Sequence, residues 1–136
     1  MSRHVATPAG LLGTVGAHLG PTGPTQLTPR QWEMFERSTG APTSGTLPEL
    51  FLLSIVNLFL PDLITVDSFS MGVNVGLDRV RYPAPADPST PLSAIGEVIS
   101  AITIGEGVQV VVRVTIMSRG TAVCVADTVS RFFPEP

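Results

Sequence analysis

The sequence of 136 residues contains no lysine, only one cysteine and few charged side chains of either sign. Its eight basic residues are all arginine and are scattered along the chain, and the formal net charge is −3. Nucleic-acid binding needs clustered basic residues to neutralise phosphates, so the composition argues against a nucleic-acid partner. Only 14% of the residues are charged and 43% are hydrophobic, which predicts that another subunit covers part of an apolar surface.

The lone cysteine and the lack of a long apolar run both favour a cytoplasmic protein with no membrane partner. Cys124 cannot form an internal disulfide, which fits a reducing compartment, and we interpret it as a buried apolar side chain rather than a reactive thiol. The longest apolar run, residues 50–60, is too short for a bilayer, which needs about 20 residues. Residues 1–16 lack the sustained apolar segment of a signal peptide.

The first predicted helix begins at the segment Thr-Pro-Arg-Gln, residues 28–31. The Thr can cap the helix, the Pro suits the first helical position, and the Gln three residues after the Thr completes a capping box. We expect this helix to bury Trp32 and Phe35 and to end at Gly40.

A second helix is predicted at about residues 47–60, where nearly every side chain is apolar. A helix that is apolar on every face is normally buried all round. Glu49, Ser54 and Asn57 nevertheless fall in one arc of its surface, which must meet solvent, a polar pocket or another chain.

After Pro61 the hydrophobic period changes to two, which indicates strands. Gly-containing turns separate the predicted strands, which lie at about residues 73–82, 92–104, 107–118 and 121–132. Their short connections predict an antiparallel meander, and one apolar helix is best covered if such a sheet wraps around it. We therefore predict an α+β chain with a single hot-dog fold at residues 18–136, preceded by a flexible tail at residues 1–17.

Four blocks of the chain resemble the MaoC-like family of R-specific enoyl-CoA hydratases. The most specific is Asn74-Val-Gly76 to Tyr82-Pro-Ala-Pro85, which is similar to the family's Asn-Tyr-Gly to Arg-Phe-Pro-x-Pro strand. The other three matching blocks are His18–Gly20 followed by Leu27–Gly40, then Ser44–Ser54, and finally Gly107–Val110 with Val125–Phe133. The resemblance covers roughly residues 18–133 and independently implies a hot-dog fold and an acyl-CoA thioester as ligand.

The resemblance fails at the family's catalytic pair. MaoC-like hydratases carry Asp-x-x-x-x-His shortly after a Phe-x-x-x-Thr-Gly motif, and that motif is present here at residues 35–40. Ala41 stands where the Asp is expected, residues 41–43 replace the loop that carries the His, and no His follows. Hydration needs both an acid and a base. We therefore expect no catalytic residue on this chain and an acyl tunnel opened by the shorter loop.

Four residues on the best-matching strand, Asn74, Gly76, Arg79 and Arg81, are implied by the resemblance to lie near the thioester or the CoA arm. An Arg there can pair with a phosphate through its planar donor fork. The alternative is a strand with solvated arginines and a Gly that allows close packing. Glu49 stands where some hot-dog thioesterases place a carboxylate, although a carboxylate in a first helical turn also simply favours the helix dipole.

Three functions remain open from the sequence. The first is a subunit of a heteromeric enoyl-CoA hydratase, in which a second hot-dog chain supplies the Asp and His and the acyl group is bulky, such as a steroid side chain. The second is a non-catalytic protein that binds acyl-CoA or acyl-carrier protein, or a scaffold. The third is a thioesterase that uses Glu49. None requires a metal or a separate cofactor, because the two histidines are isolated and CoA belongs to the substrate.

Overall fold

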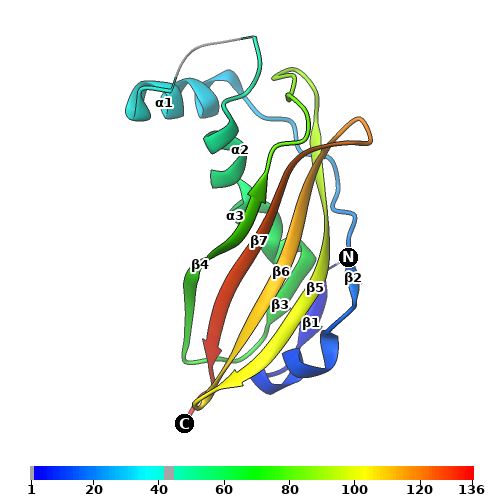
Figure 1. The fold of residues 1–136 in the computed structure, drawn as a ribbon, viewed down its shortest axis with the longest axis vertical. Coiled ribbons are helices and arrows are strands. Elements are labelled where there is room, and N and C mark those ends of the chain that lie inside the picture. The colour runs from blue at the N-terminus through cyan, green and yellow to red at the C-terminus, as the bar shows by residue number, and fades with distance from the viewer. Residues whose placement is uncertain (1, 42–44) are drawn as a thin grey trace.

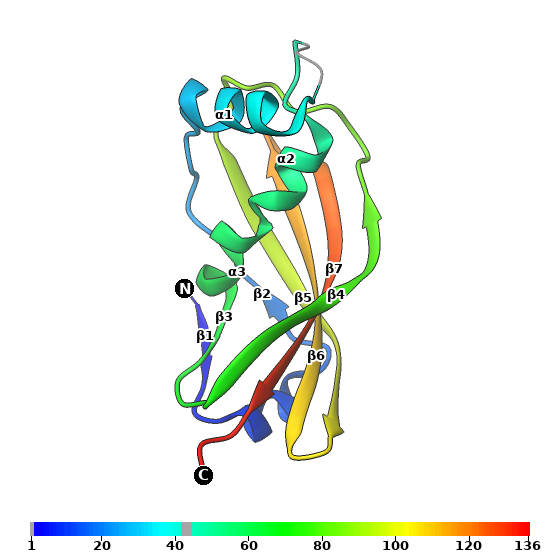
Figure 2. The ribbon, with the colours of Figure 1, turned by 90° about the vertical axis from the view of Figure 1, so that its left-hand side faces the viewer.

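In the computed structural model, which describes residues 2–41 and 45–136, a curved sheet packs against one stack of α-helices, and a 3-10 helix lies apart from that stack at the other end of the sheet (Figures 1 and 2). The helices are η1 (Pro8–Thr14, a 3-10 helix), α1 (Pro29–Thr39), α2 (Glu49–Ser54) and α3 (Val56–Leu63). The strands are β1 (Arg3–Val5), β2 (His18–Leu19), β3 (Ile64–Val66), β4 (Met71–Arg81), β5 (Leu92–Ile104), β6 (Gly107–Ser118) and β7 (Thr121–Phe133).

The main sheet has the strand order β2-β5-β6-β7-β4, so the three C-terminal strands form the predicted antiparallel meander. Strand β4 pairs antiparallel with β7 and forms one edge. The β6–β7 turn places Arg119 and Gly120 at φ 50° and 76°, a left-handed pair that matches the twist of a tight hairpin. The four predicted strands are confirmed, with ends that differ from the predicted ones by at most two residues.

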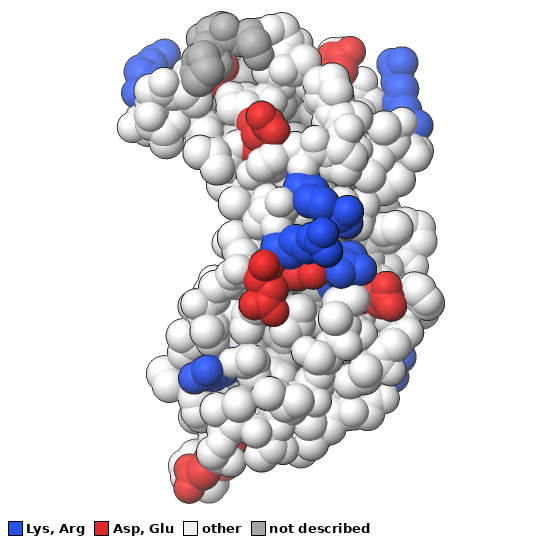
Figure 3. Space-filling model, viewed as in Figure 1, with Lys and Arg blue, Asp and Glu red and all other residues white. Residues whose placement is uncertain are grey.

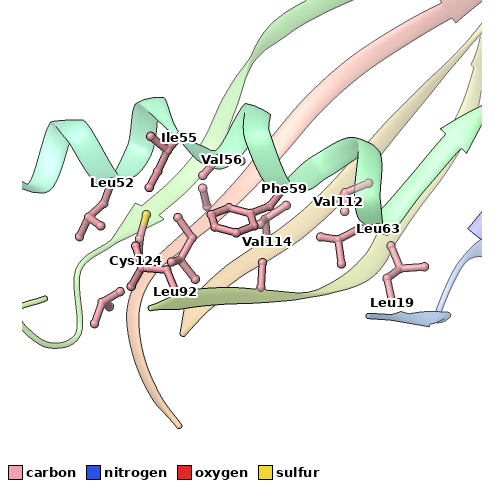
Figure 4. Packing of buried hydrophobic residues seen from close by; sticks show 14 of the residues in the cluster. Leu19, Leu52, Ile55, Val56, Phe59, Leu63, Leu92, Val112, Val114 and Cys124 are labelled. Atoms are coloured by element: carbon pink, nitrogen blue, oxygen red, sulfur yellow. The ribbon is translucent and has the colours of Figure 1, made fainter. Parts of the chain in front are cut away.

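The core lies between helices α2 and α3 and the concave face of the sheet (Figure 4). Alternate residues of β6 point into it, as the period of two predicts, and Val112, Val114 and Ile116 are buried there. Phe59 and Leu63 of α3 are buried against them. Each such side chain contributes roughly 1.5–3 kcal/mol by leaving water, so this seam is a substantial part of the stability of the fold.

The predicted helix at 47–60 differs from the observed one in three ways. It is broken at Ile55, where ψ is −1° and the neighbouring Ser54 hydroxyl donates to the Phe51 carbonyl, a local bond that competes with the helix ladder. It continues past the expected end to Leu63, whose side chain is anchored in the core. It is not buried all round, because the sheet covers one side only: Leu50 is 63% exposed and Leu58 is 53% exposed.

Helix α1 follows the predicted capping pattern but is less buried than expected. The Gln31 side chain accepts a hydrogen bond from the Thr28 backbone N–H at 2.8 Å, and the helix ends at Gly40 with φ 72°. Trp32 and Phe35 are only half-buried because α1 lies across one end of the molecule and meets few other elements (Figure 2). Phe35 makes an edge-to-face contact with Phe51 of α2 at 5.5 Å between ring centroids.

Residues 2–17 are packed rather than extended as a tail, so the structure corrects the expected flexible segment. Strand β1 pairs in parallel with β3, and the His4 imidazole contacts both the Thr65 hydroxyl and the Asp67 carboxylate. Helix η1 inserts Leu11 into the core. Neither feature has a periodic signature, because a three-residue strand and one buried Leu are too short to show one.

Truncation of Leu11 tests whether the N-terminal segment belongs to the core. Leu11 is 1% exposed and its neighbour Leu12 is 42% exposed. We expect Leu11→Ala to lower the free energy of unfolding by about 2–5 kcal/mol, because it removes core contacts and leaves a cavity. The matched control Leu12→Ala should change it by less than about 0.5 kcal/mol. Urea unfolding measures both, and equal values for the two variants would contradict the packed arrangement.

Candidate functional site

A cleft lies between the helices and the edge strand, and we name it the Asn74 cleft. Its volume is about 220 Å³, and it is lined by Leu53, Val56, Asn57, Leu60, Asn74, Gly76, Leu77, Thr128 and Val129. Two of the four predicted binding residues, Asn74 and Gly76, are therefore brought together. Asn57 faces them from α3, so this member of the predicted polar strip does meet a pocket with polar groups.

Strand β4 is irregular where it borders the Asn74 cleft. Its register against β7 shifts between Asn74 and Gly76 and again between Leu77 and Arg79. Such bulges bend a strand and re-aim its side chains, and they are common beside functional sites. A side chain at Gly76 would meet nothing within 4 Å, so this Gly is not explained by close packing inside the chain. It leaves the rim of the cleft open.

The structure separates the two predicted arginines from Asn74. Arg79 and Arg81 are in register with Asp127 and Val125 of β7, whereas the intervening Val80 is opposite the core residue Ala126. Since strand side chains alternate, both arginines belong to the face that is turned away from the helices. Arginine and acidic side chains gather over the middle of the sheet in Figure 3.

An ion pair stabilises the middle of this outer face. The Arg113 guanidinium donates to both carboxylate oxygens of Asp127, at 2.8 and 3.1 Å. This bidentate bond and the negative charge of Asp127 raise the pKa of Arg113, and the charge of Glu97 adds to the effect. Register places Glu97 beside Arg113 and Arg79 beside Asp127. Negative and positive side chains therefore alternate across the four neighbouring strands β5, β6, β7 and β4, and each attracts the next one.

Glu49 lies apart from the Asn74 cleft. It lines a separate pocket between the start of α2 and the link after β4, formed with Leu52 and residues 82–86. Partial burial, followed by the charges of Cys124 and Glu49, raises the pKa of Tyr82. Glu49 therefore has a phenol near it but no imidazole, because both histidines lie elsewhere.

Neither histidine of the chain lines the Asn74 cleft. His4 belongs to β1, with its Nδ1 atom 2.6 Å from the Thr65 hydroxyl and 3.3 Å from the Asp67 carboxylate. His18 lies on β2 in register with Glu97. Across the described ranges, no three His, Cys, Asp or Glu side chains gather as a metal site would require. The predicted loop change at residues 41–43 lies, apart from Ala41, outside the described residues.

A second cavity, which we name the apolar chamber, adjoins the Asn74 cleft and was not predicted. Its volume is about 250 Å³, and it is lined by Leu11, Leu60, Pro61, Ile64, Thr65, Val66, Phe69, Val110, Val112, Thr128, Ser130 and Phe132. Its two β7 hydroxyls, Thr128 and Ser130, were missed because they continue an ordinary buried alternation in that strand. The one available signal was a pair of hydroxyls at consecutive inward positions.

Comparison with known proteins relates this geometry to one group of enzymes. The 3-hydroxyacyl-thioester dehydratase Z of Mycobacterium tuberculosis is 29% identical over 101 residues, which are 71% of this chain and 67% of that protein. A MaoC-like dehydratase from Rhodospirillum rubrum superposes with a TM-score of 0.72 at 12% identity, over 90% of this chain and 94% of that one. The chain has the hot-dog fold of MaoC-like dehydratases.

The resemblance predicted from the sequence is thus confirmed, as is the single hot-dog domain. A C-terminally truncated HadBC complex, a 3R-hydroxyacyl-ACP dehydratase of Mycobacterium tuberculosis, also shares the MaoC-like fold with a TM-score of 0.65 and 16% identity. That superposition covers 87% of this chain and 96% of the other. No family model matches the chain. None of the helices that the structure describes has the length and apolar character needed to cross a membrane.

The thiol of Cys124 should be inert in the folded protein. Burial raises its pKa from 9.0 to about 11, so the reactive thiolate is suppressed at pH values at which an unfolded cysteine already ionises. We expect alkylation by iodoacetamide at pH 9 to be at least about tenfold slower in the native protein than in urea. Mass spectrometry follows the modification, and equal rates in both states would contradict the buried position.

Replacement of Glu49 by Gln tests the thioesterase hypothesis. Among the described residues of its pocket, Glu49 has the phenol of Tyr82 beside it but neither an imidazole nor a second carboxylate with which to share proton transfer near neutral pH. We therefore expect Glu49→Gln to leave the release of free CoA thiol from acyl-CoA unchanged. A thiol-reactive dye measures this rate, with Glu33→Gln on α1 as the matched control. A rate that falls only in the Glu49 variant would show that the Glu49 carboxylate takes part in catalysis.

Proposed function

We propose that this MaoC-like chain is a subunit of an enoyl-CoA hydratase that binds the acyl thioester while a second hot-dog subunit supplies the catalytic Asp and His. The observation that carries the proposal is the composition of the Asn74 cleft. It has the amides of Asn57 and Asn74 beside apolar walls, and none of the described residues that line it carries a carboxylate or an imidazole. Such a cleft can hold and orient a thioester without moving protons.

The chemistry of hydration explains why a partner is required. A base removes a proton from water as the oxygen adds to the β-carbon, and an acid delivers a proton to the α-carbon. Side-chain amides do not ionise near neutral pH, so Asn57 and Asn74 are limited to hydrogen bonding. The two amides are suited to orient a thioester carbonyl. General acid–base catalysis typically contributes a factor of about 10²–10⁴, and the partner would supply it.

The edge of the sheet offers the surface on which such a partner would bind. Every residue from 71 to 79 is exposed, including the apolar side chains of Met71, Val73, Val75 and Leu77. An edge strand of this length with apolar side chains is normally paired with another chain. The outline of the molecule is also hollowed between α1 and β4 (Figure 3). The similarly folded HadBC dehydratase is itself described as a complex, which supports a heteromer of this kind.

In this arrangement Arg79 and Arg81 would bind the phosphates of the CoA arm. Both are exposed on the outer face of the edge strand, and neither forms an ion pair with a described acidic residue. A CoA arm that crossed the open rim at Gly76 would pass from the cleft toward them. The acyl group would be bulky, and a steroid side chain is one candidate, because the apolar chamber extends the space beyond the cleft.

Reconstitution with a catalytic partner tests the proposed function. We expect the lone chain to leave the absorbance of trans-2-decenoyl-CoA unchanged. Addition of a hot-dog chain that retains Asp-x-x-x-x-His, such as one encoded in the neighbouring reading frame, should accelerate hydration by at least about 100-fold over either chain alone. The matched control is the complex in which the partner's catalytic His is replaced by Ala, which should be inactive.

Two outcomes would contradict the proposal. Hydration by the lone chain at the rate of the complex would show that this polypeptide carries its own acid and base. Tight binding of decenoyl-CoA with no hydration in any complex would instead favour the non-catalytic binding protein.

A further inference from the structure

The outer face of the main sheet has no covering layer. Helices α2 and α3 pack on the inner face, and no element within residues 2–41 and 45–136 lies over the opposite side (Figures 1 and 2). Strands β5, β6, β7 and β4 have 11 to 13 residues each, so this face measures roughly 40 Å by 19 Å. Its area of roughly 750 Å² is close to the about 800 Å² that each partner buries in a standard interface.

The charged row across the outer face changes sign from each strand to the next (Figure 3). Read in register from β5 to β4, its members are Glu97, Arg113, Asp127 and Arg79. The two inner members pair with each other within the chain. The two outer members, Glu97 and Arg79, are roughly 14 Å apart across three strand spacings, and neither forms an ion pair with a described residue. One charge of each sign is therefore left at opposite ends of the row.

This row is complementary to itself under one two-fold rotation. A half-turn about an axis parallel to the strands, between β6 and β7, places β4 of a second copy over β5 and its β7 over β6. Glu97 then faces Arg79 of the copy, and Arg113 faces Asp127 of the copy, so that opposite signs meet at all four positions. A half-turn about an axis along the row would place each charge over itself. Since like charges in contact are costly, the row favours the first arrangement.

A second row of the outer face matches under the same rotation. From β5 to β4 it consists of Ile102, Gln109, Arg131 and Val73. The rotation places Ile102, which is 49% exposed, over Val73 of the copy, which is 39% exposed. It also places Gln109 over Arg131 of the copy, and these two side chains already form a hydrogen bond of 2.8 Å within each chain. Apolar groups therefore meet apolar groups, and an acceptor meets a donor.

We propose that a second copy of this chain binds the outer face, related by a two-fold axis that runs parallel to the strands between β6 and β7. The occupant is the same chain because the two halves of the face complement each other, which is the defining property of a two-fold interface. Sheets packed face to face keep their strand directions within about 30° of each other, and this rotation aligns them. The backbone edge of β4 stays free, so the copy and a catalytic partner occupy different surfaces.

Charge reversal tests the two-fold pairing in the full chain by sedimentation velocity. We expect the wild type to self-associate, and Glu97→Arg or Arg79→Glu to weaken this association at least about tenfold, because each pair of identical chains then contains two like-charge contacts. The double variant, and an equimolar mixture of the two single variants, should both associate within about threefold of the wild type. Within one chain the new charges lie beside Arg113 and Asp127, which have the same sign, so only contacts between chains explain such a recovery.

Matched controls carry the same charge changes away from the outer face. Glu106→Arg and Arg119→Glu lie in the β5–β6 and β6–β7 turns and should associate as the wild type does. Thermal unfolding of each variant checks that it is folded. If Glu97→Arg unfolds, Glu97→Gln and Arg79→Gln replace the reversals, and each should weaken association about threefold.

Three outcomes would overturn this interface. The first is a chain that stays monomeric at every concentration. The second is association that is equal in all variants, which would assign it to the edge of β4. The third is a loss of association in the single variants that neither the double variant nor the mixture recovers.

Calorimetry with decanoyl-CoA separates the interface from the CoA role proposed for Arg79. A guanidinium has five N–H donors, so Arg79 can bind a carboxylate of the copy and a phosphate together. Weaker association of Arg79→Glu with unchanged decanoyl-CoA affinity would support the interface and remove Arg79 from the CoA site. Weaker decanoyl-CoA binding with unchanged association would overturn the interface and leave the CoA role.

Discussion

The structure depends on the burial of an apolar helix by a sheet that can reach only one side of it. Phe59 and Leu63 pack against β5 and β6, and both are almost completely removed from water. Leu50 and Leu58 remain outside this contact because the five strands stop at β4. Because the sheet ends at β4, this edge strand is exposed, and two cavities remain along the helix. The features relevant to ligand and partner binding are therefore consequences of incomplete coverage of one hydrophobic element.

The division of polar groups between the two faces of the sheet follows from strand alternation. Inward positions of β7 carry small or hydroxyl-bearing side chains next to the helix, whereas outward positions carry Asp127 and Arg131. Arg113 and Asp127 satisfy each other through a bidentate pair, which keeps their charges out of the core and fixes the orientation of the guanidinium. The outer face of the sheet therefore carries the paired charges, whereas the inner face borders the two cavities.

Strand positions were predictable from the sequence because β5, β6 and β7 have long period-two patterns separated by Gly-containing turns. Periodicity and capping also identified α1 and its end at Gly40. The pairing of β1 with β3 was not predictable, since each has three residues and they lie far apart in the chain. The break at Ile55 depends on one side-chain hydrogen bond, and helical periodicity does not register such a bond.

Within the site, family resemblance led to Asn74 and Gly76. The separation of Arg79 and Arg81 from Asn74 follows from strand alternation, because both lie an odd number of residues beyond it. The two bulges in β4 were not predictable, because no residue type marks them.

The parallel pairing of β1 with β3 has a kinetic consequence. His4 and Thr65 are 61 residues apart in the chain, so their contact closes a long loop that includes α1, α2 and α3. The entropic cost of such a closure rises only with the logarithm of the loop length, but contacts of this separation form slowly relative to local ones. The meander β5–β7 needs only adjacent hairpins and would therefore assemble first. Docking of the N-terminal residues is then a late step, and until it occurs the interior beside Leu11 remains open to solvent.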